Sequence, residues 1–171
     1  MTAWISKRAA LAVAMSIGAA VAAGGALAHD GDHMPTGKIS AATRAAHVRH
    51  ENFEKLGKAF KGLLDEIKKP SPDMAVVSTN TKTMAVLANG LPTWFPRGSG
   101  VEARPKSQAK ANVWTDAAGF SAKASAMQVQ VSKLNQAALS GDINAVRAQV
   151  RPTGGACKGC HDVYRLEEKK S

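Results

Sequence analysis

The sequence predicts an all-α fold, an antiparallel up-down-up-down four-helix bundle, on three observations. Apolar residues recur at helical spacing over four long segments: 39–69, 73–89, 107–139 and 143–169. The connections between these segments are short except between the second and the third, so consecutive helices should be antiparallel neighbours. No segment shows the two-residue alternation of a half-buried strand.

The first two helices are expected at 39–69 and 73–89. In the first, apolar residues at 3-4-3-4 spacing form a bundle seam: Phe53, Leu56, Phe60, Leu63 and Ile67. Pro70 and Pro72 should end this helix. The buried face of the second helix is expected to comprise Met74, Val77, Thr81, Met84 and Ala88. Gly90 should end it in the left-handed conformation, with Pro92 following.

The main loop is expected at 91–106, where three prolines and two glycines oppose a regular element. Trp94 and Phe95 within it should pack against the bundle. The buried side of the third helix, 107–139, is predicted to contain Trp114, Ala117, Ala124, Met127, Val131, Leu134 and Ala138.

The fourth helix is expected at 143–169, with Gly141 ending the helix before it and Asp142 capping its start. Its core face is predicted to contain Ile143, Val146 and Val150. A kink or a short break is expected at Pro152, Gly154 and Gly155.

The N-terminal end has the pattern of a secretory signal peptide over residues 1–28. Lys7 and Arg8 precede a mostly apolar stretch, and Ala26-Leu27-Ala28 is a small-x-small cleavage site. An uncleaved membrane anchor is the alternative, but the apolar stretch is rich in Ala and Gly and weakly hydrophobic. We therefore expect a periplasmic protein with no membrane association after cleavage, a flexible leader at 29–38, and one domain at 39–171.

The chain is basic. Removal of residues 1–28, which hold two basic residues and no acidic one, lowers the formal net charge from +10 to +8. Nucleic acid is not an expected partner, because the few aromatic residues are not interleaved with the basic ones and the chain is expected to be exported. Solubility and the steering of a redox partner protein account for the charge.

The sequence Cys157-Lys158-Gly159-Cys160-His161 is the attachment signature of a c-type haem. On a helix, Cys157, Cys160 and His161 lie on one face, so two thiols can add to the vinyl groups of one haem while the imidazole reaches the iron. A thioredoxin-like pair would need a strand-helix context, and a structural zinc site would need four ligands. We predict one covalently attached haem c, with His161 as axial iron ligand and no structural disulfide.

Four stretches also carry a resemblance to a known family: the nine residues Cys-Lys-Gly-Cys-His-Asp-Val-Tyr-Arg at 157–165, Val-Trp-Thr-Asp-Ala-Ala-Gly-Phe at 113–120, Leu-Pro-x-x-Phe at 91–95, and Arg49 four residues before Phe53. They resemble those of cytochrome c prime, the class II c-type cytochromes, over nearly the whole expected mature chain. The resemblance implies that Arg165 lies beside His161 on the same helical face and that Arg49 contacts a haem propionate. Solvated or ion-paired surface charges are the alternatives for both arginines.

The resemblance places Phe53 on the open side of the iron, where low-spin relatives have a methionine ligand. It thus implies a five-coordinate, high-spin haem that binds small gases such as NO and CO, passes single electrons to partner proteins, or both, with dimers common in the family. The alternative is a low-spin, six-coordinate electron-transfer cytochrome, for which His50 is the candidate ligand. His50 or Glu102 is otherwise expected at the haem edge. We expect no enzyme, since a peroxidase would need a distal acid-base pair.

Overall fold

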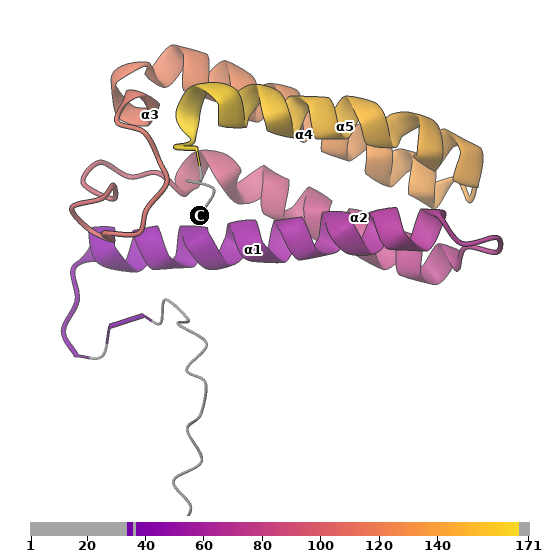
Figure 1. Ribbon diagram of the computed structural model, residues 1–171, viewed down its shortest axis with the longest axis horizontal. Helices are drawn as coiled ribbons and strands as arrows, with labels where there is room; N and C mark the ends of the chain where they lie inside the picture. Colours follow the sequence, from indigo (N-terminus) through magenta and orange to yellow (C-terminus); the bar gives the residue numbers. More distant parts are fainter. Residues whose placement is uncertain (1–33, 36, 168–171) are drawn as a thin grey trace, which may run out of the picture. The chain divides into compact units, whose positions relative to one another are not determined.

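The computed structural model describes residues 34–35 and 37–167, so the expected signal peptide and most of the leader lie outside the described residues. The described part is a helical bundle, as Figure 1 shows, and its fold class is confirmed. The four long helices are α1 (Ala41–Ile67), α2 (Met74–Gly90), α4 (Ala117–Leu139) and α5 (Ile143–Tyr164). Two short elements, η1 (Leu91–Thr93) and α3 (Asn112–Thr115), flank the main loop.

The four long helices pack in an up-down-up-down order. Helix α1 packs along α2, α2 along α4, and α4 along α5. By contrast, α1 and α5 contact each other at few points, although both border the same side of the bundle (Figure 1). This loose pairing of the first and last helices leaves room for a group between them.

Side-chain caps fix where the helices begin. Ser40, Asp73, Asp116 and Asp142 each accept a hydrogen bond from a backbone N–H in the first turn of the helix that follows. Gly141 has φ of 75°, in the left-handed region, so the chain reverses between α4 and α5 as predicted.

The predicted seams form the core. Leu63, Val77, Val131, Leu134 and Val146 are fully buried. Met84 and Met127 are also buried in this apolar cluster, which confirms them as core residues. In the third predicted helix, however, Ala117 is exposed, whereas Val113 and Phe120 are buried in its place.

The boundaries of the third and fourth predicted helices were wrong at one end each. Residues 108–110 are not helical, because they pair with the chain after α5: Lys110 N–H donates to the Tyr164 carbonyl (2.9 Å). Likewise, Leu166 N–H donates to the Gln108 carbonyl (2.8 Å), so α5 ends at Tyr164 rather than at 169. Asp116 separates α3 from α4 because its carboxylate caps the Gly119 N–H instead of continuing the helix.

Two further details differ from expectation. Gly90 has φ of −78° and is not left-handed; its role is close approach, since a Cβ there would lie 3.0 Å from Nε1 of Trp94. Helix α5 continues through Pro152 without the expected break. Pro152 and Ala148 are both exposed, so the Ala148 carbonyl that the proline leaves without an N–H partner can be hydrated.

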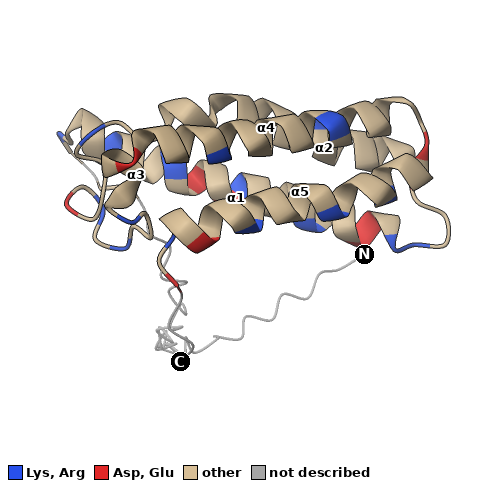
Figure 2. Ribbon diagram, turned by 90° about the horizontal axis from the view of Figure 1, so that it is seen from above, with Lys and Arg blue, Asp and Glu red and all other residues tan. Residues whose placement is uncertain are grey.

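Basic residues are spread over several helices and the loops rather than gathered into one patch (Figure 2). Those on α1 are largely neutralised, because Lys55, Lys58 and Lys61 each lie near an acidic residue one turn away. Within the part of the chain that the structure describes, no helix has the length and apolar character needed to cross a membrane.

Candidate haem site

The two cysteines of the attachment motif lie on the inner side of α5. Cys157 and Cys160 are half-buried and pack against the hydrophobic core. Burial raises the pKa of both thiols above the usual value, so both are protonated at neutral pH. Neither is in a disulfide. The helix therefore presents two thiols, one turn apart, to the interior of the bundle.

His161 follows at the exposed end of the same helix. Partial desolvation lowers the pKa of its imidazole, and the nearby positive charge of Arg165 lowers it further. The ring is thus neutral near pH 7, which is the form that ligates iron. Among the described residues, no group of three or more His, Cys, Asp or Glu side chains gathers into a metal-binding cluster.

Arg165 lies near His161, but not as the fourth-helix register suggested. It is the residue after α5 and has extended backbone, with φ of −109° and ψ of 137°. Its N–H donates to the His161 carbonyl (3.0 Å), and its Nε donates to Oε1 of Gln108 (2.8 Å). The pairing of residues 108–110 with residues 164–166 therefore holds the arginine near the motif, with no need for a helix beyond residue 164.

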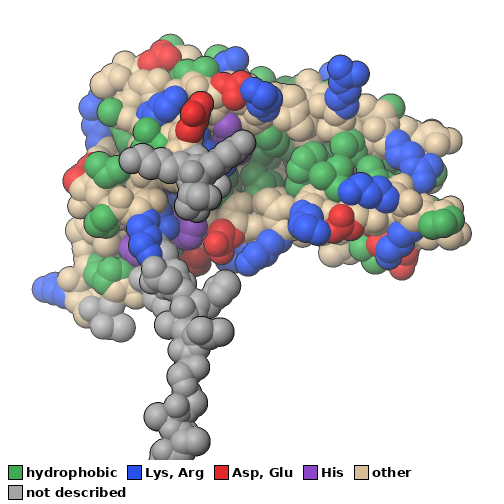
Figure 3. All heavy atoms as spheres, viewed as in Figure 1, with side chains coloured by type: hydrophobic (Ala, Val, Ile, Leu, Met, Phe, Trp, Pro, Cys, Tyr) green, Lys and Arg blue, Asp and Glu red, His purple; other side chains and the backbone are tan. Residues whose placement is uncertain are grey.

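A hollow opens between α1 and α5 on the face shown in Figure 3, and hydrophobic side chains line it. Half-buried apolar side chains on these two helices pack against the core cluster: Phe53, Phe60, Val150, Ala156, Cys157 and Cys160. An apolar space beside two inward-facing thiols and a neutral histidine suits a flat, apolar, iron-holding macrocycle. The residues present therefore fit a covalently attached haem.

Phe53 belongs to a group of aromatic rings that joins α1 to the main loop. Its ring meets that of Trp94 edge-on, with centroids 5.1 Å apart, and that of Phe95 at 6.1 Å. Phe95 in turn contacts Phe120 (4.7 Å), which contacts Tyr164 (5.3 Å). Trp94 and Phe95 thus pack against the bundle as predicted, and they do so directly at Phe53.

Arg49 lies one turn before Phe53 and is only 4% exposed, so it is not a surface ion pair. Its Nη1 donates to the Trp94 carbonyl (3.1 Å) and to Oγ of Ser99 (2.8 Å). Its Nη2 donates to the Ser99 carbonyl (2.6 Å) and to Oγ of Ser107 (3.3 Å). Burial lowers the pKa of Arg49 to about 10, and the charge of Arg104 adds to this, so the guanidinium stays charged at neutral pH.

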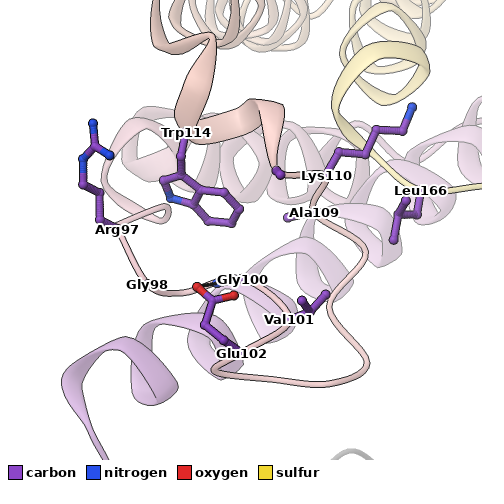
Figure 4. A pocket seen from close by; sticks show the side chains of 10 residues that line it. Arg97, Gly98, Gly100, Val101, Glu102, Ala109, Lys110, Trp114 and Leu166 are labelled. Atoms are coloured by element: carbon purple, nitrogen blue, oxygen red, sulfur yellow. Dashed lines mark hydrogen bonds between the residues drawn. The ribbon is translucent and has the colours of Figure 1, made fainter.

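His50 follows Arg49 on α1, and Glu102 lies in the loop, where its negative charge partly offsets the lowering of the Arg49 pKa. The Nε2 atom of His50 lies 3.5 Å from Oε1 of Glu54, its neighbour one turn on, and the side chain is partly exposed. Glu102 is exposed and accepts the Gly100 N–H (3.1 Å). It lines a separate pocket of about 480 Å³ between the loop and Leu166, where Figure 4 shows its carboxylate beside Gly98 and Gly100, opposite Trp114.

Sequence reasoning missed the contacts that hold the motif helix against α4. The Tyr164 hydroxyl donates to Oδ2 of Asp116 (2.6 Å), and the same carboxylate caps Gly119. A Cβ at Gly119 would lie 2.3 Å from Oδ2 of Asp116 and 2.5 Å from the Tyr164 hydroxyl, so a larger residue would displace this pair of side chains. The capping preference of aspartate at 116 was the signal available in the sequence.

Comparisons with known proteins agree with this geometry. The family model for cytochrome c' matches residues 44–165, most of the chain. A cytochrome c' of Rubrivivax gelatinosus is 41% identical over 100 residues, which are 58% of this chain and 70% of that protein. A cytochrome c' of Alcaligenes xylosoxydans xylosoxydans is 33% identical over 125 residues, 72% of this chain and 94% of that protein.

Solved structures show the same fold. A nitric oxide complex of a mutant cytochrome c prime from Alcaligenes xylosoxidans has a TM-score of 0.68 at 27% identity, covering 77% of this chain and all of that one. A carbon monoxide-bound variant from that organism has a TM-score of 0.67 at 27% identity, covering 76% and 100%. The chain belongs to the cytochrome c' family, whose members carry one covalently attached haem c.

Proposed function

We propose that this protein is a periplasmic c-type haem protein with a five-coordinate, high-spin iron that binds small gases such as NO and CO, passes single electrons, or both. Cys157 and Cys160 would hold the haem and His161 would be its axial ligand. When bound, haem supplies an iron that can take a gas or an electron. The observation that carries the proposal is Phe53, an apolar ring on α1 in place of a ligand.

The surroundings of Phe53 favour an uncharged ligand. The rings beside it, those of Trp94 and Phe95, offer apolar edges. Nε1 of Trp94 lies beside Gly90, where it would be 3.0 Å from a Cβ. A site without a hydrogen-bond donor would not stabilise charge on bound oxygen, whereas NO and CO need no such donor. The related proteins solved with nitric oxide and with carbon monoxide support this choice.

Electron transfer is retained as a second function because of the surface charge. The formal net charge without residues 1–28 is +8, and basic residues lie on several helices and in the loops (Figure 2). Such a surface steers association with an acidic partner protein. The proposal includes export through a signal peptide at 1–28, no membrane or nucleic-acid partner afterwards, and a homodimer as in the family. It assigns no catalytic residue.

The experiment is a CO titration of the ferrous holoprotein, followed optically in the parent and in two variants. The parent should bind one CO per haem. Phe53→Met introduces a thioether at this position and should give a low-spin spectrum with greatly weakened CO binding. His50→Ala should leave the parent spectrum unchanged. A parent that ignores CO, or that becomes high-spin only in His50→Ala, would contradict the five-coordinate proposal.

A further inference from the structure

We propose that Arg49 is a positioning residue: it clamps the loop segment 94–107 onto α1 and thereby keeps Phe53 closed over the site where gas binds. This inference deepens the proposed function and rests on it. The sequence resemblance suggested instead that Arg49 contacts a haem propionate. In the structure, the hydrogen bonds of Arg49 go to the loop instead.

The guanidinium of Arg49 is almost fully used by the loop. A guanidinium has five N–H groups, two on each Nη and one on Nε. The two Nη atoms together make four hydrogen bonds to the loop: to the Trp94 carbonyl, the Ser99 hydroxyl, the Ser99 carbonyl and the Ser107 hydroxyl. Only the Nε–H is left over. A carboxylate could be bound by the usual two-pronged contact only if the loop were released.

These four bonds close a segment that lacks regular structure. They join the start of the segment at Trp94, its middle at Ser99 and its end at Ser107 to one side chain on α1. Ser99 is fully buried, and its hydroxyl also donates to the Pro96 carbonyl (2.7 Å). Because the shared donor is charged and buried, its loss would loosen the segment at three points at once. The two hydrogen bonds from Nε1 of Trp114, to the Phe95 carbonyl (3.0 Å) and the Pro96 carbonyl (3.1 Å), would remain.

The segment that Arg49 holds packs against Phe53. The Arg49 guanidinium carbon lies 4.6 Å from the centroid of the Phe95 ring, so the arginine fixes this ring directly as well as through the backbone. Phe95 and Trp94 both meet Phe53 edge-on. Phe53 therefore cannot move toward the loop unless the loop moves too, and Arg49 controls whether it does.

The first test measures the loop itself by limited trypsin digestion of the holoprotein with mass analysis. Arg97 is an exposed cleavage site within the segment. Arg49→Met should raise the rate of cleavage after Arg97 by at least about tenfold, since the closed loop loses its charged hydrogen bonds. Arg147→Met is the matched control, because Arg147 donates to the Ile67 carbonyl at the opposite end of α1 and should leave cleavage unchanged.

The second test asks whether Arg49 acts through Phe53. The rate of CO association is measured in Arg49→Met, Phe53→Ala and the double variant. Arg49→Met should speed association about tenfold in the parent background and have no effect when Phe53 is already alanine. Ser99→Ala removes only one of the acceptors and should shift both readouts in the same direction by less, so the test stands even if Arg49→Met does not fold.

The outcomes distinguish a failure of the Arg49 clamp from a failure of the proposed gas-binding function. Unchanged cleavage after Arg97 in both Arg49→Met and Ser99→Ala would overturn the clamp. So would an effect of Arg49→Met on CO association that persists in the Phe53→Ala background, as expected of a propionate contact. A parent holoprotein that does not bind CO would defeat the proposed gas-binding function, while the digestion result would still decide whether Arg49 clamps the loop.

Discussion

Replacement of Phe53 by alanine has two consequences whose sizes follow from the ring contacts. Moving Phe53 aside means giving up its edge-on contacts with Trp94 at 5.1 Å and Phe95 at 6.1 Å. Each such aromatic pair is worth about 0.5–1.5 kcal/mol, so opening the site costs about 1–3 kcal/mol. Truncating the ring removes this cost, and CO association should become about 5- to 150-fold faster.

Phe60→Ala is the control for this substitution. Phe60 lies on the same helix, is also half-buried against the core, and lies about 10 Å further along the helix axis. Both substitutions remove the same number of apolar atoms, and in each the lost burial alone should lower the free energy of unfolding by about 2 kcal/mol. Phe53→Ala should cost about 1–3 kcal/mol more, because it also loses the two ring contacts.

Laser photolysis of the CO complex gives the association rate, and urea unfolding followed by circular dichroism gives the stability. The expected result is fast CO association in Phe53→Ala alone, with both variants destabilised. Equal association rates in Phe53→Ala and Phe60→Ala would refute the reasoning, since Phe53 would then be an ordinary seam residue and not a lid.

Two further predictions concern stability. The hydrogen bond to Asp116 raises the pKa of Tyr164 to about 12, so the stability that the neutral phenol contributes should be present below pH 10 and lost as pH rises through about 12. Tyr164 is the only tyrosine, so tyrosinate absorbance reports it directly, and Asp116→Asn should bring its midpoint back toward 10. Gly57→Ala, on an exposed turn of α1 with no atom within 4 Å of the new Cβ, should stabilise the protein by about 0.5–1 kcal/mol in thermal unfolding. Gly90→Ala should fail to give this gain, because its Cβ would crowd the Trp94 ring at 3.0 Å; a gain equal to that of Gly57→Ala would show that this close approach is unimportant.

The parts of the fold that depend on local pattern were predictable. The seam positions Leu56 and Leu63, the cap at Asp142 and the left-handed Gly141 each follow from neighbours in sequence, and all are confirmed. The errors in the helix boundaries lie where distant segments meet. Residues 107–111 have the composition of a helix, but their backbone pairs with residues 164–166, which no periodicity in either segment reveals.

The candidate site likewise has some features that the sequence predicts and others that it does not. The motif spacing predicted that Cys157 and Cys160 would lie on one face of a helix, and both pack against the core from α5. The partners of Arg49 could not be predicted, because Ser99 and Ser107 lie about 50 residues away in an irregular loop. A buried guanidinium needs acceptors, yet the sequence does not indicate whether a ligand or the protein backbone supplies them.

The most direct test of the central claim is electron paramagnetic resonance of the ferric holoprotein, combined with the optical spectrum of its ferrous form. An iron held only by His161 on the protein side, beneath the Phe53 ring, should give a high-spin ferric signal and a broad ferrous band that sharpens when CO is added. A low-spin ferric signal and sharp ferrous bands that do not respond to CO would contradict the account, because a second protein side chain would then occupy the place assigned to the gas.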